Sequence, residues 1–298
     1  MTDEVADAVA DGRPVVALES TLLVHGLPAG RNLDVAQRLE RTVRAEGAVP
    51  ATVAVLEGMP TVGLAKTQLY ALCTGGEIPK LSLRDLGPAI ALGRSGATTV
   101  ASTAVLAHAA GVGVFATGGL GGVHLPAGGS PTTWDVSADI GVLASTPVLV
   151  VCSGVKSVLD IPATLELLET RSVPVLGYQT DDFPAFYLRS SGHPVPWRVD
   201  GPAGAADVVR AHRAVCGSGV LLANPVPVEF EMDGELHRRL LDEAMAVLSG
   251  QNVRGSDVTP VLLEHFHQAS GGVSADVNEA LVLSNARVAA QVAVELAG

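Results

Sequence analysis

Short apolar runs alternate with longer amphipathic stretches along most of the sequence. Each apolar run has the length and composition of a strand that is buried on both faces of a sheet. Six such runs are predicted strands: residues 14–17, 51–56, 113–116, 148–152, 173–176 and 219–223. Strands of this kind need helices above and below them, so the alternation restricts the chain to a layered α/β fold.

The amphipathic stretches supply these helices. In residues 32–47, Asn32 can cap a helix, apolar residues spaced four apart share one face, and Gly47 can end it. Similar patterns cover residues 162–171, 235–250, 259–272 and 275–297. We therefore predict a three-layer α/β/α sandwich with a mostly parallel or mixed central sheet.

Two segments depart from the alternation. From about Gly234 onward the pattern is helical only, which predicts a C-terminal helical region that caps the fold. Residues 189–208 are rich in Gly and Pro and are expected to form a surface connection. A chain of 298 residues that is 48% hydrophobic can bury one large core, so we expect a single domain over residues 1–298.

Charge and cysteine usage exclude several classes of protein. The net charge of −12 argues against an extended nucleic-acid surface, which needs clustered Lys and Arg. The three cysteines show no CxxC spacing, so neither a disulfide framework nor a zinc site is expected. The acidic N-terminus lacks the features of a signal peptide, and no run is expected to span a membrane. We predict a cytoplasmic protein that contacts neither nucleic acid nor membrane.

Lysine is scarce in this sequence. Only Lys66, Lys80 and Lys156 occur, against 16 arginines. Arg can replace Lys as a simple positive charge, but an amine nucleophile must lose a proton, which guanidinium does not do. Lys156 follows the predicted strand 148–152, where partial desolvation could lower its pKa. It is a candidate nucleophile, or else a residue at a helix start that pairs with Asp160.

The other two lysines have simpler interpretations. Lys66 is expected on a solvated helix surface, and Lys80 either binds a phosphate or faces water. Glu19 follows the first predicted strand, where burial can raise the pKa of a carboxyl enough for proton transfer near neutral pH. It could instead cap a helix or form an ion pair. His25 lies nearby, and a lone histidine is more often structural than catalytic.

The segment FATGGLGGVH joins a predicted strand to Thr117, paired glycines and His124. Glycines allow backbone N–H groups to approach an anion closely, so this segment is a candidate phosphate-binding nest, although glycine-rich turns are also common in ordinary α/β proteins. In WDVSAD, Asp135 and Asp139 are four residues apart and, on a helix, would face one side. They could hold a hard cation together, or simply complement the positive end of a helix.

Seven ordered blocks resemble the pseudouridine-5'-phosphate glycosidase family, from about Pro14 to near the C-terminus. These blocks are VVALESTLLVHG, GATTVAST, FATGGLGGVH, WDVSAD, VVCSGVKSVLD, GYQTDDFPAFY and LLANPVP. The resemblance implies a glycosidase, classed with hydrolases or lyases, that reversibly cleaves pseudouridine 5'-phosphate to uracil and ribose 5-phosphate. It also implies a divalent cation, usually manganese, and a homotrimer. The loop 124–135 is longer than the family pattern, and residues 189–208 match it poorly.

The resemblance also implies roles for individual residues. Lys156 matches the nucleophile, Glu19 the proton-transferring residue and Asp135 the metal-associated aspartate. The residues that match substrate-contacting or other active-site positions are Lys80, Val100, Thr117, His124, Ser137, Ala138, Asp139 and Asn278.

An amine nucleophile suits a carbon–carbon glycosidic bond. Such a bond has no heteroatom leaving group that protonation alone could release, so the usual route through two carboxylates is poorly suited to it. If Lys156 condenses with C1' of the ring-opened ribose, the iminium becomes an electron sink and the bond to uracil can break. In this hypothesis Glu19 moves the protons, and Lys80, His124 and the glycine turn hold the phosphate.

Two other functions fit parts of the same pattern. One is a C-glycoside synthase that joins ribose 5-phosphate to a non-uracil aromatic acceptor, with acceptor choice set by the pocket around residues 179–187. The other is a non-catalytic sugar-phosphate binding protein, which would have no need for a nucleophilic amine at Lys156.

Overall fold

A computed structural model describes residues 1–28, 30–125, 134–156, 158–251 and 258–298. The strands are β1 (Val15–Leu18), β2 (Val49–Leu56), β3 (Met59–Val62), β4 (Lys80–Leu81), β5 (Gly96–Thr98), β6 (Val114–Ala116), β7 (Val123–His124), β8 (Leu149–Cys152), β9 (Leu159–Asp160), β10 (Val175–Tyr178), β11 (Trp197–Val199) and β12 (Val220–Ala223). The helices are α1 (Asp3–Ala10), α2 (Thr21–His25), α3 (Asn32–Ala45), α4 (Lys66–Thr74), α5 (Leu83–Ala91), α6 (Val100–Ala109), α7 (Ala138–Leu143), α8 (Ile161–Thr170), α9 (Pro202–Val215), α10 (Gly234–Gln251), α11 (Val258–Ala269) and α12 (Val273–Ala297), with a 3₁₀ turn at Val228–Phe230.

The central sheet is mixed but mainly parallel. Its strand order is β11-β10-β12-β8-β6-β1-β2-β5-β4, and β3 pairs with β2 outside this path. The strands from β11 to β2 are all parallel, whereas β5 and β3 run antiparallel to β2. All six predicted strands form part of this sheet, and their burial on both faces explains why their sequences are continuously apolar.

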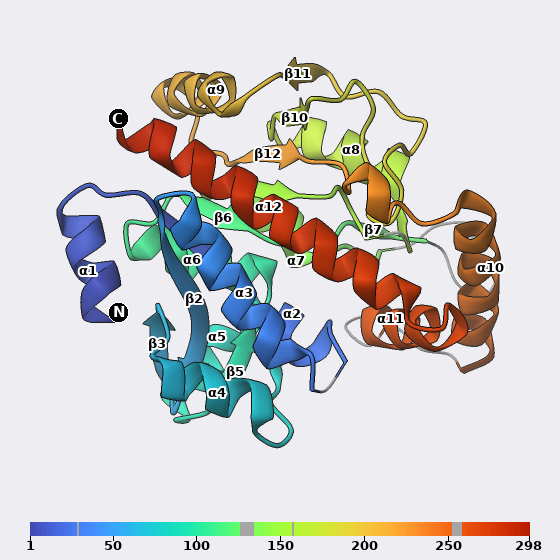
Figure 1. The fold of residues 1–298 in the computed structure, drawn as a ribbon, viewed down its shortest axis with the longest axis horizontal. Coiled ribbons are helices and arrows are strands. Elements are labelled where there is room, and N and C mark those ends of the chain that lie inside the picture. The colour runs from blue at the N-terminus through green and yellow to red at the C-terminus, as the bar shows by residue number, and fades with distance from the viewer. Residues whose placement is uncertain (29, 126–133, 157, 252–257) are drawn as a thin grey trace.

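Helices cover both faces of the sheet, as predicted. The helices α3, α9 and α12 lie together on the face toward the viewer in Figure 1, where α12 packs on β1, β6 and β8. On the opposite face, α6 packs against α7 and against β1 and β2. In α3, Val35, Leu39 and Val43 are buried as the periodicity predicts, and Gly47 beyond its end has a positive φ of 88°.

The C-terminal region differs from the prediction in one respect. Residues from Gly234 onward are helical, but α12 is not a peripheral cap, because it crosses the middle of the sheet (Figure 1). By length and composition alone this helix could also cross a membrane, contrary to the expectation from the sequence. In the protein it instead buries one side against strands and carries the buried amides of Asn278 and Asn285.

The Gly- and Pro-rich segment 189–208 is more ordered than predicted. It contains the edge strand β11 and the first turns of α9, and β11 pairs with β10 in parallel register. Pro194 and Pro196 precede this strand and lie outside it, so its own N–H groups remain available for pairing at the sheet edge. The longer loop 124–135 lies mostly outside the described residues.

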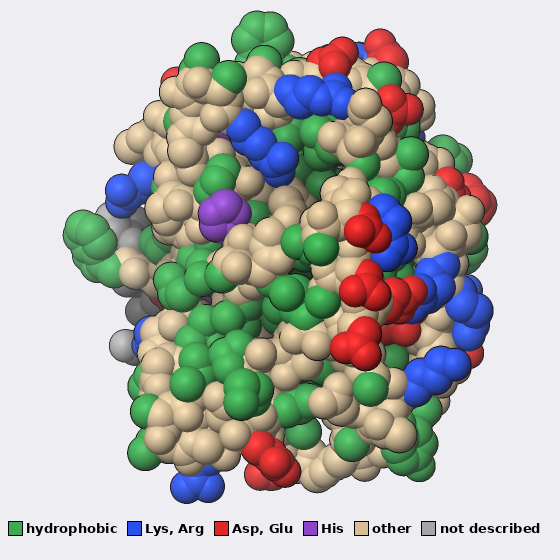
Figure 2. Space-filling view, turned by 90° about the vertical axis from the view of Figure 1, so that its left-hand side faces the viewer, with side chains coloured by type: hydrophobic (Ala, Val, Ile, Leu, Met, Phe, Trp, Pro, Cys, Tyr) green, Lys and Arg blue, Asp and Glu red, His purple; other side chains and the backbone are tan. Residues whose placement is uncertain are grey.

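Charged side chains are mixed on the surface. On the face shown in Figure 2, basic groups lie beside acidic ones, and the described residues form no continuous basic band there. Ion pairs such as Arg44 with Glu4 and Arg31 with Asp276 account for several of the described charges.

Candidate active site

The first part of the site lies where two neighbouring strands end. The strands β1 and β6 are parallel, with Leu18 opposite Ala116, so the next residues, Glu19 and Thr117, emerge side by side. Both side chains are buried, and the Thr117 hydroxyl donates a hydrogen bond to the Glu19 carboxylate. Burial raises the pKa of Glu19, while the charge of Lys156 and the Thr117 bond pull it back down. A carboxyl whose pKa is raised in this way is a candidate for proton transfer.

Lys156 lies beyond the next strand, β8. The segment that carries it runs parallel to the turn after β6: Leu120 N donates to Gly154 O at 2.9 Å, and Lys156 N donates to Leu120 O at 3.2 Å. Gly154 has a φ of 81° and lies against Pro184, so that a Cβ there would come within 2.0 Å of the Pro184 oxygen. The turn therefore needs glycine at this position to direct the lysine inward.

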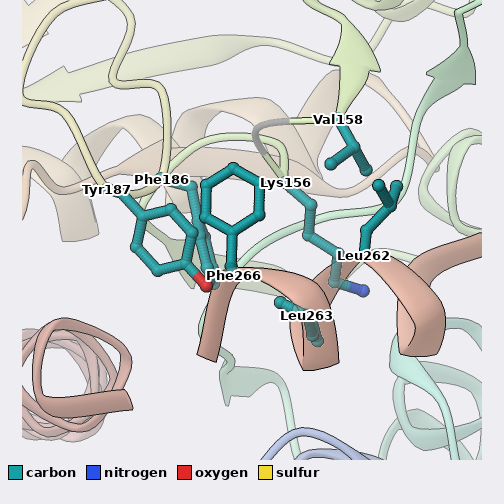
Figure 3. Close-up of a pocket in the computed structure, with 7 residues that line it drawn as sticks. All are labelled: Lys156, Val158, Phe186, Tyr187, Leu262, Leu263 and Phe266. Atoms are coloured by element: carbon teal, nitrogen blue, oxygen red, sulfur yellow. The ribbon is translucent and has the colours of Figure 1, made fainter. Parts of the chain in front are cut away.

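The Lys156 side chain is half-buried and lines a small apolar cavity. Val158, Phe186 and Tyr187 form one part of its wall, and α11 contributes the rest through Leu262, Leu263 and Phe266. Figure 3 shows the lysine extending so that its amine lies beside the two leucines of α11. Its positive charge lowers the pKa of both Glu19 and His124, so the three groups are coupled electrostatically. The prediction that Lys156 lies just beyond a buried strand is therefore correct.

The alternative interpretation of Lys156 as a helix-start residue is wrong. The next helix, α8, begins only at Ile161, and Asp160 caps it by accepting a hydrogen bond from Ala163 N at 2.9 Å. The carboxylate of Asp160 therefore serves the helix end. Lys66, by contrast, is an exposed residue in the first turn of α4, as predicted.

Asp139 fixes the glycine turn. Its carboxylate accepts hydrogen bonds from Gly121 N at 2.8 Å and from Ala101 N at 2.9 Å, and its own N–H donates to the Ser137 hydroxyl at 3.2 Å. The side chain thus ties the turn after β6 to the first turn of α6, next to the buried Val100. Ala138, the first residue of α7, is exposed.

The predicted phosphate nest is only partly compatible with this arrangement. Leu120 N and Gly121 N donate to Gly154 O and Asp139, and Val123 N donates to the Thr164 hydroxyl at 3.0 Å. These three amides are therefore used within the protein. Sequence patterns identify the freedom of the glycines but not which acceptor their N–H groups meet.

Asp135 and Asp139 do not share a helix, because α7 begins after Asp135. Asp135 instead lies beside His124: Asp135 Oδ2 is 3.5 Å from His124 Nδ1, and His124 N donates to Asp135 O at 3.0 Å. Burial lowers the pKa of His124, Asp135 acts to raise it, and Lys156 lowers it further. Among the described residues no cluster of three or more His, Cys, Asp or Glu side chains could hold a metal.

Lys80 and His25 belong to the same side of the sheet. Lys80 begins β4, and its charge lowers the pKa of both Glu19 and His25. Burial is the main cause of the lowered pKa of His25, and its buried Nε2 has no hydrogen-bond partner within the described part of the chain. A neutral imidazole near a lysine is suited to binding a polar substrate group.

Asn278 reaches the site from α12. Its amide nitrogen donates to Gly26 O at 3.1 Å, and its buried Oδ1 has no hydrogen-bond partner among the described residues. This oxygen lies close to Gly118, 3.4 Å from where a Cβ of that glycine would be. The structure thus brings Glu19, Thr117 and Lys156 to adjoining strand ends, with Asn278 beside the glycine turn, whereas Ala138 is exposed.

Sequence reasoning missed the contribution of α11. Leu262, Leu263 and Phe266 have the spacing of any helix that packs on a core, so their sequence gives no sign that they cover a lysine. The sandwich of Phe266 against Tyr187, with ring centroids 5.4 Å apart, fixes α11 over the cavity.

Comparison with known proteins gives a consistent result. Residues 4–295 match the family model described as Indigoidine synthase A like protein. A relative from Herpetosiphon aurantiacus, named pseudouridine-5'-phosphate glycosidase, is 51% identical over 99% of this chain and 97% of its own length. A relative of the same name from Saccharopolyspora erythraea is 50% identical over 100% of this chain and 98% of its own.

Two solved structures share the fold. The prealnumycin C-glycosynthase AlnA, in complex with ribulose 5-phosphate, is 40% identical, has a TM-score of 0.90, and aligns over 99% of this chain and 96% of its own. An indigoidine synthase A-like protein from Thermotoga maritima is 33% identical, has a TM-score of 0.88, and aligns over 96% of this chain and 94% of its own.

Proposed function

Since this chain belongs to the family of Indigoidine synthase A like proteins, and its relatives at about half identity are named pseudouridine-5'-phosphate glycosidase, we propose that it reversibly cleaves pseudouridine 5'-phosphate. The products are uracil and ribose 5-phosphate. The observation that carries this proposal is a lysine amine beneath an apolar wall, near a buried carboxyl with a raised pKa. This pair provides a nucleophile and a proton carrier for one carbon atom.

The reaction begins with opening of the ribose ring, in which the C1'–O4' bond breaks and O4' gains a proton. The uncharged Lys156 amine then forms a bond to C1' and loses a proton. When the bond between C1' and uracil C5 breaks, its electron pair stays on C5, which takes a proton, and C1' becomes an iminium carbon bonded to Lys156. Water hydrolyses the iminium to release ribose 5-phosphate and the free amine.

Glu19 is suited to carry the protons in these steps. Its raised pKa extends the protonated form to higher pH than in an exposed glutamate, while the Thr117 hydroxyl stabilises the ionised form. Lys80, whose charge acts on Glu19, supplies a positive charge for the phosphate group of the substrate. Binding of the phosphate, remote from the reacting bond, orients C1' toward the amine.

We also propose that Asp135 and His124 hold a divalent cation, manganese in the family pattern. The residues fit a sparse site of this kind, because a carboxylate lies 3.5 Å from an imidazole nitrogen that has no hydrogen-bond partner in the described chain and whose pKa is lowered. When bound, the cation would order water and substrate oxygens. A homotrimer, implied by the family resemblance, and a cytoplasmic location, expected from the sequence, complete the proposal.

The test is reductive trapping. Incubation with ribose 5-phosphate and borohydride should add the mass of the reduced sugar phosphate to the peptide that contains Lys156. The variant Lys156→Arg should fold, should not be labelled, and should show no turnover of pseudouridine 5'-phosphate. Lys66→Arg is the matched control and should be labelled and active, because Lys66 is exposed on α4. Normal turnover by Lys156→Arg would disprove the lysine mechanism, and a labelled but inactive wild type would disprove the substrate.

A second function is favoured by one comparison, the 40% identity with a C-glycosynthase. The same chemistry run in the synthetic direction would join ribose 5-phosphate to another aromatic carbon. Incubation of the protein with ribose 5-phosphate and either uracil or a larger aromatic acceptor separates the two: product formed from uracil alone supports the glycosidase.

A further inference from the structure

Asn285 lies on the same side of α12 as Asn278, two helical turns further along, and none of its surface is exposed. Its amide nitrogen donates to Thr117 O at 2.8 Å and to the Ser153 hydroxyl at 3.1 Å, and approaches Gly118 O at 3.4 Å. Its oxygen accepts a hydrogen bond from the Asn224 amide at 2.9 Å. The amide NH₂ group and the amide oxygen of Asn285 therefore both have hydrogen-bond partners.

These partners follow three neighbouring strands. Thr117 follows β6, Ser153 follows β8 and Asn224 follows β12, and the three strands are adjacent in the sheet. One side chain thus joins the ends of three strands. Two of these ends lead directly into the candidate site, one through Thr117 and the other toward Lys156.

The glycines after Thr117 explain why such an anchor is needed. Strand pairing fixes Thr117 N, which donates to Val151 O at 3.0 Å, but the next two residues are Gly118 and Gly119. Ser153 N donates to Gly118 O at 2.9 Å, so pairing with the end of β8 holds the Gly118 carbonyl, whereas the Thr117 carbonyl is held from α12 by the Asn285 amide. A Cβ at Gly119 would come within 3.4 Å of the Lys156 side chain, so the direction of the Thr117 carbonyl also determines the space beside the lysine.

We propose that Asn285 is a positioning residue: by holding the Thr117 carbonyl and the Ser153 hydroxyl, it keeps the Thr117 hydroxyl on Glu19 and the glycine pair against Lys156. The proposal rests on the proposed function for its effect on turnover. Its effect on the Glu19 carboxyl does not, because the Thr117 hydroxyl lies on Glu19 in the protein without any substrate.

The first measurement is the titration of Glu19 by ¹³C NMR, with the signal assigned by its loss in Glu19→Gln. Thr117→Val removes the hydroxyl that stabilises the carboxylate, so the Glu19 titration should move to higher pH. Asn285→Ala should move it in the same direction, and the double variant should move it little further, because both changes break one chain of contacts. If Glu19 titrates in Asn285→Ala as in the wild type, the proposal is wrong.

The second measurement is turnover of pseudouridine 5'-phosphate. Asn285→Ala should lose roughly 10- to 100-fold in kcat, the equivalent of one or two lost hydrogen bonds. In the pH profile of kcat, the limb that reports the ionisation of Glu19 should move to higher pH. The matched control is Asn32→Ala, which removes another buried amide that donates to a backbone carbonyl, Cys73 O at 2.8 Å, in a different part of the fold. It should lower stability without changing kcat or the pH limb.

Each outcome has a defined meaning. If Asn285→Ala is less stable but keeps the wild-type kcat and pH limb, the residue is structural only and the proposal is overturned. If Asn285→Ala does not fold, Asn224→Ala replaces it, because it removes the bond that orients the Asn285 oxygen and one bond to the Ser284 hydroxyl, while the Asn285 amide itself stays in place. An inactive wild type would refute the proposed function, and the Glu19 titration would still decide the role of Asn285.

Discussion

The carboxylate of Asp139 provides a direct test of how the glycine turn is held. The variant Asp139→Asn has nearly the same shape, but its NH₂ group must face either Gly121 N or Ala101 N, which now donate to the two carboxylate oxygens at 2.8 and 2.9 Å. One charge-assisted hydrogen bond is lost, and one buried N–H is left without an acceptor. These effects together should cost about 2–4 kcal/mol of unfolding free energy.

Such a loss is a large part of the roughly 5–15 kcal/mol by which a domain is stable. For a chain of this size it corresponds to a fall in Tm of roughly 3–6 °C. Denaturant unfolding gives the free energy, and calorimetry gives the Tm. The matched control is Asp34→Asn, whose side chain is 65% exposed and 3.8 Å from Arg38. It should change the free energy by less than about 0.5 kcal/mol.

The reasoning fails if Asp139→Asn is as stable as Asp34→Asn. That result would mean that the turn is held by its other contacts, and that the two amides find acceptors without the carboxylate. A loss of activity without a loss of stability would instead assign Asp139 to substrate contact alone.

Three further predictions follow from burial and geometry. Glu19→Gln should be inactive yet more stable than the wild type at pH 8, because burial raises the pKa of Glu19 and the fold disfavours its ionised form. The gain in unfolding free energy should disappear as the pH falls toward 4.5, the ordinary pKa of a glutamate. An equal gain at all pH values would contradict this. Gly154→Ala should lower the free energy of chemical unfolding by about 2 kcal/mol more than Gly192→Ala does. Both glycines have a positive φ, but a Cβ would meet a neighbouring oxygen only at Gly154. Equal losses of unfolding free energy would argue against a clash. Iodoacetamide at pH 8 should label Cys216 before Cys152. The Ser218 hydroxyl lowers the pKa of Cys216, whereas burial raises the pKa of Cys152 to about 12. Mass spectrometry that found Cys152 labelled first in the folded protein would refute the assigned burial.

The central strands were the most predictable part of the fold. Runs such as 148–152 and 219–223 are apolar throughout because the strands are buried on both faces, so burial leaves a direct record in the sequence. Short strands at the margins leave none. The strand β4 has two residues and β11 includes the exposed Trp197, so their pairing depends on neighbours that are distant in sequence.

The candidate site was predictable to the extent that a strand end identifies it. Glu19, Thr117 and Lys156 directly follow buried strands or lie a few residues beyond them, and parallel pairing brings strand ends together. The partner of each group was not predictable. The pattern WDVSAD is compatible with a helical carboxylate pair, but the helix starts at Ala138, and Asp139 instead accepts hydrogen bonds from backbone groups 18 and 38 residues away.

Helix α12 also bears on how the protein emerges from the ribosome. The strands β1, β6 and β8 are all synthesised before residue 153, yet one face of each is covered by a helix that begins at Val273. Until that helix leaves the exit tunnel, the nascent sheet exposes apolar surface of the kind that chaperones bind. Synthesis therefore delays both completion of the core and assembly of the strand ends that Asn285 joins, so the polypeptide should acquire its binding competence only after α12 has left the exit tunnel.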